Sequence, residues 1–132
     1  ITHGFVGADL SMLCKEAEAS IIMSTTEEGL MRKVRALKPI LEKAKARGVK
    51  IRIAVPINEK SKEAIDKLEG AAEVKELKDL SARFCIVDSK QLLFMMLEDK
   101  DVHPTYDLAM WVHTPYFASA MQGMFDLAWK KG

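Results

Sequence analysis

Short apolar runs alternate with longer stretches of helical periodicity along the chain, and this alternation restricts the fold more than any other feature. The runs at residues 20–24, 49–57 and 72–77 predict strands, because β-branched and apolar residues cluster there between turn-forming residues. Apolar residues recur every three to four positions between these runs and over residues 8–19, which is typical of helices with one buried face. Strand and helix in alternation favour parallel pairing with crossover helices.

The second half of the chain adds a hairpin to this pattern. Residues 82–87 and 92–97 are apolar and β-prone, and the residues between them, Asp88 to Gln91, suit a tight turn. A further strand is expected over 106–112, and Pro115 is expected to start a final helix. The predicted fold class is therefore α/β, a mixed β-sheet flanked by helices on both faces.

Three residues predict where helices begin or bend. Thr25 and Glu28 have the spacing of a capping box at the start of the long helix that follows the first strand. Pro39 is expected to kink or split that helix, because proline lacks the N–H that the helix needs. Ser61 is expected to cap a short helix over residues 61–68.

Composition narrows the functional class. The 132 residues suit one domain, and 48% hydrophobic with 30% charged residues is typical of a globular protein. No apolar run approaches the roughly 20 residues of a membrane helix, and no secretory signal is visible, so we expect a cytoplasmic protein without a membrane partner. A net charge of +1 does not favour direct nucleic-acid binding. Cys14 and Cys85 are expected to be buried free thiols.

Residues 81–88 have the spacing of the phospholipase D signature H-x-K-x4-D, with Ser81, Arg83 and Asp88 at its three chemical positions. In that superfamily the His attacks phosphorus, the Lys holds the phosphate charge and the Asp supports the His. The resemblance implies a site that binds but does not hydrolyse, because a serine without a base is a poor nucleophile. No catalytic residue is predicted. The alternative is a residual phosphodiesterase or nuclease in which a histidine from elsewhere completes the site.

The residues that carry a second resemblance extend over nearly the whole chain. Residues 21–30, 46–52, 82–88 and 107–117 together resemble the phospholipase D-like C-terminal domain of archaeal TrmB-like transcriptional regulators. The resemblance implies a non-catalytic domain that forms a homodimer and responds to an effector, while DNA is bound only through a separate winged-helix domain. We predict a single domain over residues 1–132, with residues 1–12 as a candidate tag or linker remnant.

The candidate ligand-binding residues come from these motifs and from one strand end. Exposed N–H groups at the start of a helix form an anion site, although the hydroxyls there equally suit plain helix capping. Arg83 of the motif suits binding of a phosphate or carboxylate, or alternatively a surface ion pair. Asp88 of the motif alternatively has a structural role only, as the residue that opens the hairpin turn. His113, directly after the last predicted strand, is expected to line a cleft or to lie in the core or a dimer contact. The predicted set is Ser24, Thr25, Thr26, Ser81, Arg83 and His113, with a sugar or an anion as effector.

No cofactor and no metal are predicted. The acidic stretch 98–101 and the nearby His103 suggest a metal only weakly, because isolated loop carboxylates are usually solvated. The sequence also contains no G-x-x-x-x-G-K-[ST] loop for nucleotide phosphates.

Overall fold

The computed structural model describes residues 2–77, 83–95 and 108–131, which form a seven-stranded sheet and four helices. The elements in chain order are β1 Thr2–Phe5, α1 Val6–Glu16, β2 Ser20–Ser24, α2 Glu27–Ala46, β3 Lys50–Ala54, α3 Glu59–Leu68, β4 Glu73–Lys75, β5 Phe84–Val87, β6 Gln91–Met95, β7 Leu108–His113 and α4 Pro115–Lys131. The strand order is β1-β7-β6-β5-β2-β3-β4. Strands β2, β3 and β4 are parallel to one another, and the remaining pairs are antiparallel.

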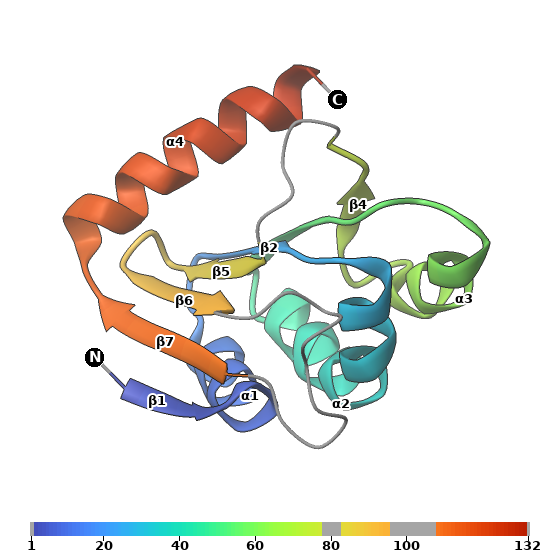
Figure 1. Cartoon of the computed structure of the whole chain (residues 1–132), viewed down its shortest axis with the longest axis horizontal. Coiled ribbons are helices and arrows are strands. Elements are labelled where there is room, and N and C mark those ends of the chain that lie inside the picture. The colour runs from blue at the N-terminus through green and yellow to red at the C-terminus, as the bar shows by residue number, and fades with distance from the viewer. Residues whose placement is uncertain (1, 78–82, 96–107, 132) are drawn as a thin grey trace.

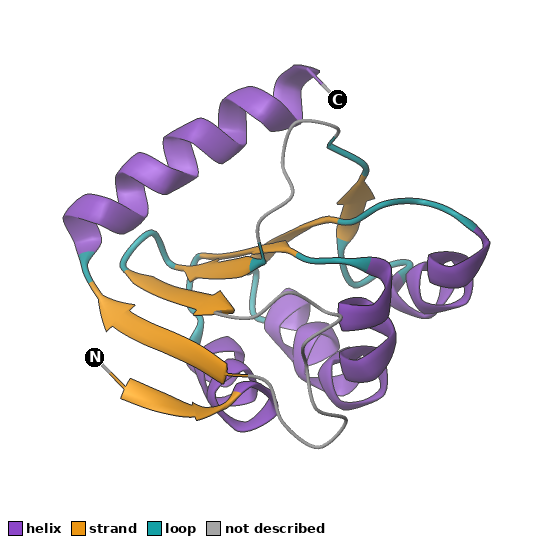
Figure 2. Cartoon of the chain, in the orientation of Figure 1, coloured by secondary structure: helices purple, strands orange, loops and turns teal. Residues whose placement is uncertain are grey.

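Helices cover both faces of the sheet, which confirms the predicted fold class. Helices α1, α2 and α3 lie on one side, and α4 crosses the other side alone (Figure 1). Figure 2 shows the same three layers by secondary structure. Among the helices that the structure describes, none is long and apolar enough to cross a bilayer.

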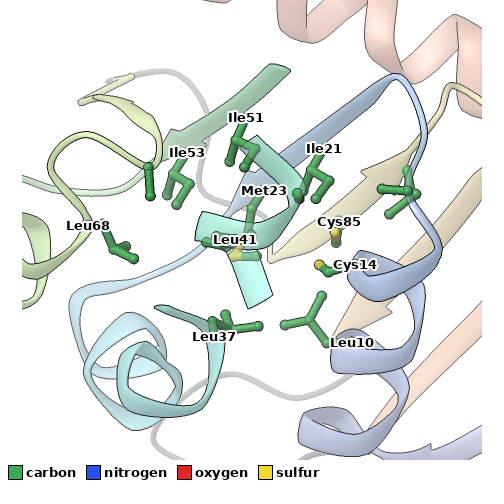
Figure 3. Close-up of a cluster of buried hydrophobic side chains, with 14 of the residues drawn as sticks. Leu10, Cys14, Ile21, Met23, Leu37, Leu41, Ile51, Ile53, Leu68 and Cys85 are labelled. Carbon is green, nitrogen blue, oxygen red and sulfur yellow. The ribbon is translucent and has the colours of Figure 1, made fainter. Parts of the chain in front are cut away.

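Two hydrophobic clusters correspond to the two faces of the sheet. In the first, Leu37 and Leu41 of α2 pack toward Ile21 and Met23 of β2 (Figure 3). The second lies under α4, where the ring of Phe125 meets that of Phe84 edge to face at 6.4 Å between centroids. Alternate residues of one strand join different clusters because successive strand side chains point to opposite faces.

The helix starts correct two predictions from the sequence. The N-cap of α2 is Thr26, whose Oγ1 accepts a hydrogen bond from the N–H of Gly29 at 3.1 Å, so the proposed box of Thr25 and Glu28 is wrong. The N-cap of α3 is Asn58 rather than Ser61. Ser61 lies three residues later and accepts the Asn58 N–H at 3.0 Å, which is the reciprocal half of a capping box.

Two further elements differ from expectation. Helix α2 continues through Pro39 as one helix, so the proline does not split it. Strand β1 was not predicted, because four residues are too few to show a clear alternation. It pairs antiparallel with β7 and forms the edge of the sheet. That residues 1–12 are a tag or linker remnant stays a prediction.

The hairpin between β5 and β6 has the predicted turn. Asp88 and Ser89 both have positive φ, at 56° and 58°, and the Lys90 N–H donates to Val87 O at 3.1 Å. Two central residues with positive φ define the type I′ turn, whose twist matches that of a two-stranded ribbon. Asp88 therefore opens the turn and has a structural role there.

Candidate functional site

The strongest candidate for a binding group is the hydroxyl of Thr25, directly after β2. The Thr25 N–H donates to Ala54 O at 3.0 Å, which holds the backbone beside β3. The side chain is only 6% exposed, and its Oγ1 has no hydrogen-bond partner among the residues that the structure describes. A buried hydroxyl without a partner is costly, so this oxygen has hydrogen-bonding capacity that the described residues do not use.

The first turn of α2 lies directly over this hydroxyl. A Cβ on Gly29 would come within 2.5 Å of Thr25 Oγ1, so the close contact requires glycine at this position. The same Cβ would lie 3.7 Å from Nζ of Lys33, which brings the lysine ammonium to the same place. Lys33 is 9% exposed, which is unusual for lysine, and the N–H groups of the first helical turn add partial positive charge.

Arg83 reaches the same end of the sheet from β5. The antiparallel register pairs Ser24 with Phe84, and extended by one residue it places Arg83 opposite Thr25. Arg83 is 7% exposed, and it lies two residues from Cys85, whose side chain belongs to the cluster under α1 and α2. Lys33 and Arg83 each already take part in an interaction, so they form a cationic environment and not a pair of free charges.

The other predicted ligand residues do not join this group among the described residues. Thr26 is engaged as the N-cap of α2. Ser24 and Ile22 are two residues apart, so their side chains point to the same face of the sheet, the one that α4 covers. The side chain of Thr25 points to the face that α2 covers. Ser81 lies outside the described residues.

Asp88 and His113 lie at the opposite end of the sheet. Strand β5 separates Arg83 from Asp88, and five residues at about 3.3 Å each put them roughly 17 Å apart. The register of β6 places His113 opposite Gln91, beside the hairpin turn, and its side chain is exposed. The motif's arginine and aspartate therefore do not share a site, and the structure does not bring His113 to Thr25.

The carboxylate of Asp88 binds backbone instead. Its Oδ1 accepts from the N–H groups of Ala19 at 2.7 Å and Ser20 at 3.0 Å, and its Oδ2 accepts from that of Glu18 at 3.0 Å. The Asp88 N–H in turn donates to Ser20 O at 2.9 Å. This aspartate joins the hairpin to the segment between α1 and β2, so its oxygens are not directed at a reacting group.

The two cysteines are buried free thiols, as predicted from the sequence. They face each other between α1 and β5 in the first cluster (Figure 3). The hydrogen bond with Cys14, together with burial, raises the pKa of the Cys85 thiol well above its usual range, and the charge of Lys33 opposes this only in part. A thiol held in its neutral form is neither a good nucleophile nor a good metal ligand.

Two other kinds of site receive little support. Within the described parts of the chain, no group of three or more His, Cys, Asp or Glu side chains is placed to hold a metal ion. The acidic stretch 98–101 and His103 lie outside those parts. A groove between α2 and α3 has a volume near 190 Å³, below the ~300 Å³ at which ligand pockets usually start, and it contains no predicted ligand residue. It is lined by Met31, Val34, Lys60, Glu63, Ala64 and Lys67.

Sequence reasoning missed Gly29 and Lys33. A signal was present for Lys33, which lies between Leu30 and Leu37 on the apolar side of α2, where solvent is excluded. For Gly29 the sequence carried no clear signal, because the need for glycine depends on how the Thr25 side chain turns toward the first turn of α2.

Comparison with solved structures shows the same fold in proteins of low sequence identity. TrmBL2, an archaeal chromatin protein, matches with a TM-score of 0.73 and 19% identity over 98% of this chain and 52% of its own, so this chain spans about half the length of TrmBL2. Nuc from Salmonella typhimurium, a phospholipase D family member, matches with a TM-score of 0.76 and 15% identity over 99% of this chain and 94% of its own. NucT from Helicobacter pylori matches with a TM-score of 0.72 and 13% identity over 98% and 94% of the two chains.

The comparison with protein families is more specific than the comparison of folds. No curated protein matches the sequence. The family described as "Transcriptional regulator TrmB, EBD N-terminal subdomain" matches residues 8–132, nearly the whole chain, and so confirms the resemblance found in the sequence. The chain therefore belongs to the TrmB family of transcriptional regulators, as an N-terminal subdomain of the EBD.

Proposed function

We propose that this chain is a non-catalytic, dimerising and effector-sensing domain of an archaeal transcription regulator in the cytoplasm. DNA would be bound only through a separate domain of the longer protein. The observation that carries the non-catalytic part is the residue at position 81, because Ser81 stands where the phospholipase D signature has its nucleophilic His, and a serine without an activating base attacks poorly. Asp88, at the other end of β5, binds the backbone N–H groups of residues 18–20.

The effector would bind where β2 ends and α2 begins. Three features support this position: the unpartnered hydroxyl of Thr25, the cations of Lys33 and Arg83, and the N-terminal turn of α2. Buried cations and helix N–H groups favour a negative group, and a hydroxyl adds a directional hydrogen bond. The preferred effector is therefore a small molecule with a phosphate or carboxylate, and a neutral sugar is the second choice.

Thermal denaturation tests the effector site. The probes are inorganic phosphate, a sugar phosphate, the matching neutral sugar and a nucleotide. A ligand at ten times its Kd stabilises the native state by about 1.4 kcal/mol. For a 132-residue domain that is a rise in Tm of about 5 °C, using roughly 2.1 cal/mol/K of unfolding entropy per residue.

Two variants locate any binding that is found. Thr25→Val removes the hydroxyl at nearly constant volume, and Arg83→Gln removes the charge, so both should reduce the ligand-induced shift. Lys67→Gln is the control, because Lys67 lies in α3 and pairs with Glu63 at 3.5 Å, away from Thr25. If no probe shifts Tm, or if both variants respond like the unmodified protein, the proposed site is wrong.

A residual phosphodiesterase is the alternative, and one observation favours it. Nuc and NucT share the fold over nearly their whole length, and Arg83 retains a cation in the phospholipase D-like motif. Turnover of a generic phosphodiester, such as bis-p-nitrophenyl phosphate, decides between the two functions. Turnover that Arg83→Ala abolishes would establish the alternative, and no turnover above that of buffer is expected.

A further inference from the structure

Helix α4 is apolar on the side that faces away from the sheet. Its inner side is the buried one, with Phe125 and Trp129 in the cluster on the sheet. On the outer side Tyr116 is 91% exposed, Met124 67% and Leu127 65%. A helix that is apolar all round is normally covered on all sides, yet the described residues cover only one side of α4.

The outer face carries little charge, and the exposed lysines of α4, Lys130 and Lys131, stand in its last turn. Between Tyr116 and Trp129 the only ionisable side chain other than tyrosine is Asp126, and it pairs with Arg52 at 2.7 Å. Solvated helices in a chain with 30% charged residues carry more charge than this. With the half-exposed Phe117, the exposed apolar side chains present roughly 500 Å², about two thirds of the ~800 Å² that one partner contributes to a standard interface.

Four residues of this face, Tyr116, Ala120, Gly123 and Leu127, are placed symmetrically about a point just N-terminal of the middle of α4. Measured from the midpoint between positions 121 and 122, Tyr116 and Leu127 lie equally far out, and Ala120 and Gly123 lie equally near. In a two-fold antiparallel pair of helices, each position meets the position equally far on the other side of the midpoint. Tyr116 of one copy would then meet Leu127 of the other, and Ala120 would meet Gly123.

Gly123 gives an independent reason for a close partner. A Cβ at this position would meet nothing within 4 Å, so packing within the chain does not require glycine. A helix with glycine in its interior is less stable than the same helix with alanine, so Gly123 is unfavourable for a monomer. Opposite the small Ala120 of a second copy, it would allow the two helix backbones to approach closely.

We propose that the outer face of α4, formed by Tyr116, Phe117, Ala120, Gly123, Met124 and Leu127, binds the same face of a second copy in an antiparallel, two-fold pair. The proposal rests on the dimerisation proposed above and assigns its surface. Because the charged Lys130 and Lys131 lie at the end of this face, we expect a dimer whose Kd changes little between about 0.05 and 0.5 M salt, since there is little electrostatic attraction to screen.

Sedimentation equilibrium of the unmodified chain and three variants tests the surface. Leu127→Gln and Gly123→Gln should each raise the dimer Kd by about tenfold or more, because the first removes an apolar contact and the second places a large polar side chain where the two helices approach most closely. Gly123→Gln also replaces glycine by a better helix former, so its monomer should unfold at a temperature no lower than that of the unmodified monomer. The control is Met31→Gln, a change at a half-exposed methionine on α2 that should leave Kd unchanged.

Cross-linking tests the antiparallel register. A mixture of Tyr116→Cys and Leu127→Cys proteins should form disulfide-linked pairs of one chain of each kind, whereas either protein alone should cross-link far less. The native Cys14 and Cys85 are fully buried and do not compete. A strict monomer at about 100 µM would overturn both the proposed dimerisation and this surface. The outer face of α4 would then be expected to bind another part of the longer regulator. A dimer that survives both glutamine variants would overturn the α4 surface alone.

Discussion

Removing the carboxylate of Asp88 should destabilise the fold, and a series of three substitutions separates the causes. The carboxylate accepts the N–H groups of Glu18, Ala19 and Ser20, and the residue also has a left-handed φ of 56°. Asp88→Gly loses the carboxylate but adopts positive φ without strain. Asp88→Ala loses the carboxylate and adds strain, because a Cβ is disfavoured in that region. Asp88→Asn tolerates the backbone and retains one acceptor oxygen.

The magnitudes follow from the number of hydrogen bonds and their exposure. A hydrogen bond to a charged group contributes about 1.5–3 kcal/mol, but water can reach the N–H groups of Glu18 and Ala19, so the whole set is expected to contribute about 2–3 kcal/mol. The unfolding entropy of a 132-residue domain, near 0.28 kcal/mol/K, converts 2 kcal/mol into about 7 °C of Tm. Asp88→Ala should cost about 1 kcal/mol more than Asp88→Gly, and Asp88→Asn about 1 kcal/mol in total.

Urea denaturation followed by circular dichroism measures these differences, with Tm from calorimetry as a second reading. The expected order of stability is the unmodified chain, then Asp88→Asn, then Asp88→Gly, then Asp88→Ala. A free energy of unfolding for Asp88→Gly within about 0.5 kcal/mol of the unmodified chain would refute the backbone role of the carboxylate. Equal losses of unfolding free energy for Asp88→Asn and Asp88→Ala would show that the acceptor oxygen retained by asparagine does not contribute to stability.

Three further outcomes are expected. Because the pKa of the Cys85 thiol is raised in the folded state, the unfolded chain loses its proton first, so the free energy of unfolding should fall as pH rises above about 8.5, by up to ~1.4 kcal/mol per pH unit. Cys85→Ala should flatten that slope, and equal slopes would contradict the raised pKa. Arg47 donates to the carbonyls of Cys14, Lys15 and Ala17, so Arg47→Ala should cost about 1–2 kcal/mol in urea denaturation, and Arg47→Lys less. Gly29→Ala should destabilise by about 1–3 kcal/mol despite the better helix propensity of alanine, and adding Thr25→Ala should restore part of the loss; a more stable Gly29→Ala protein would contradict the close contact.

The sequence predicted the described elements well wherever periodicity was long enough to read. The six strands after β1 and all four helices appear near their predicted positions, because one buried face imposes its period on the sequence. Helix starts were less certain. Thr25 and Thr26 are adjacent and chemically alike, and local sequence does not reveal which of the two faces the free N–H groups.

The site was predictable only in part. The motif indicated Arg83, and the junction of a strand with a helix indicated Thr25, as separate candidates; the register of β2 and β5 then placed them opposite each other. The register of β6 and β7 removed His113 from the group, because it places His113 opposite Gln91, beside the hairpin turn and at the other end of the sheet from Thr25.

By itself, the sequence determined the class of fold and the family, because hydrophobic period and motif spacing are local properties of the chain. It also determined that Asp88 lies in a turn. The tertiary structure decided what these residues face. Strand pairing gave Asp88 three backbone partners and placed Arg83 opposite Thr25, and helix packing left one side of α4 apolar and not covered by the described residues. These outcomes depend on contacts between residues far apart in the chain, which no local pattern encodes.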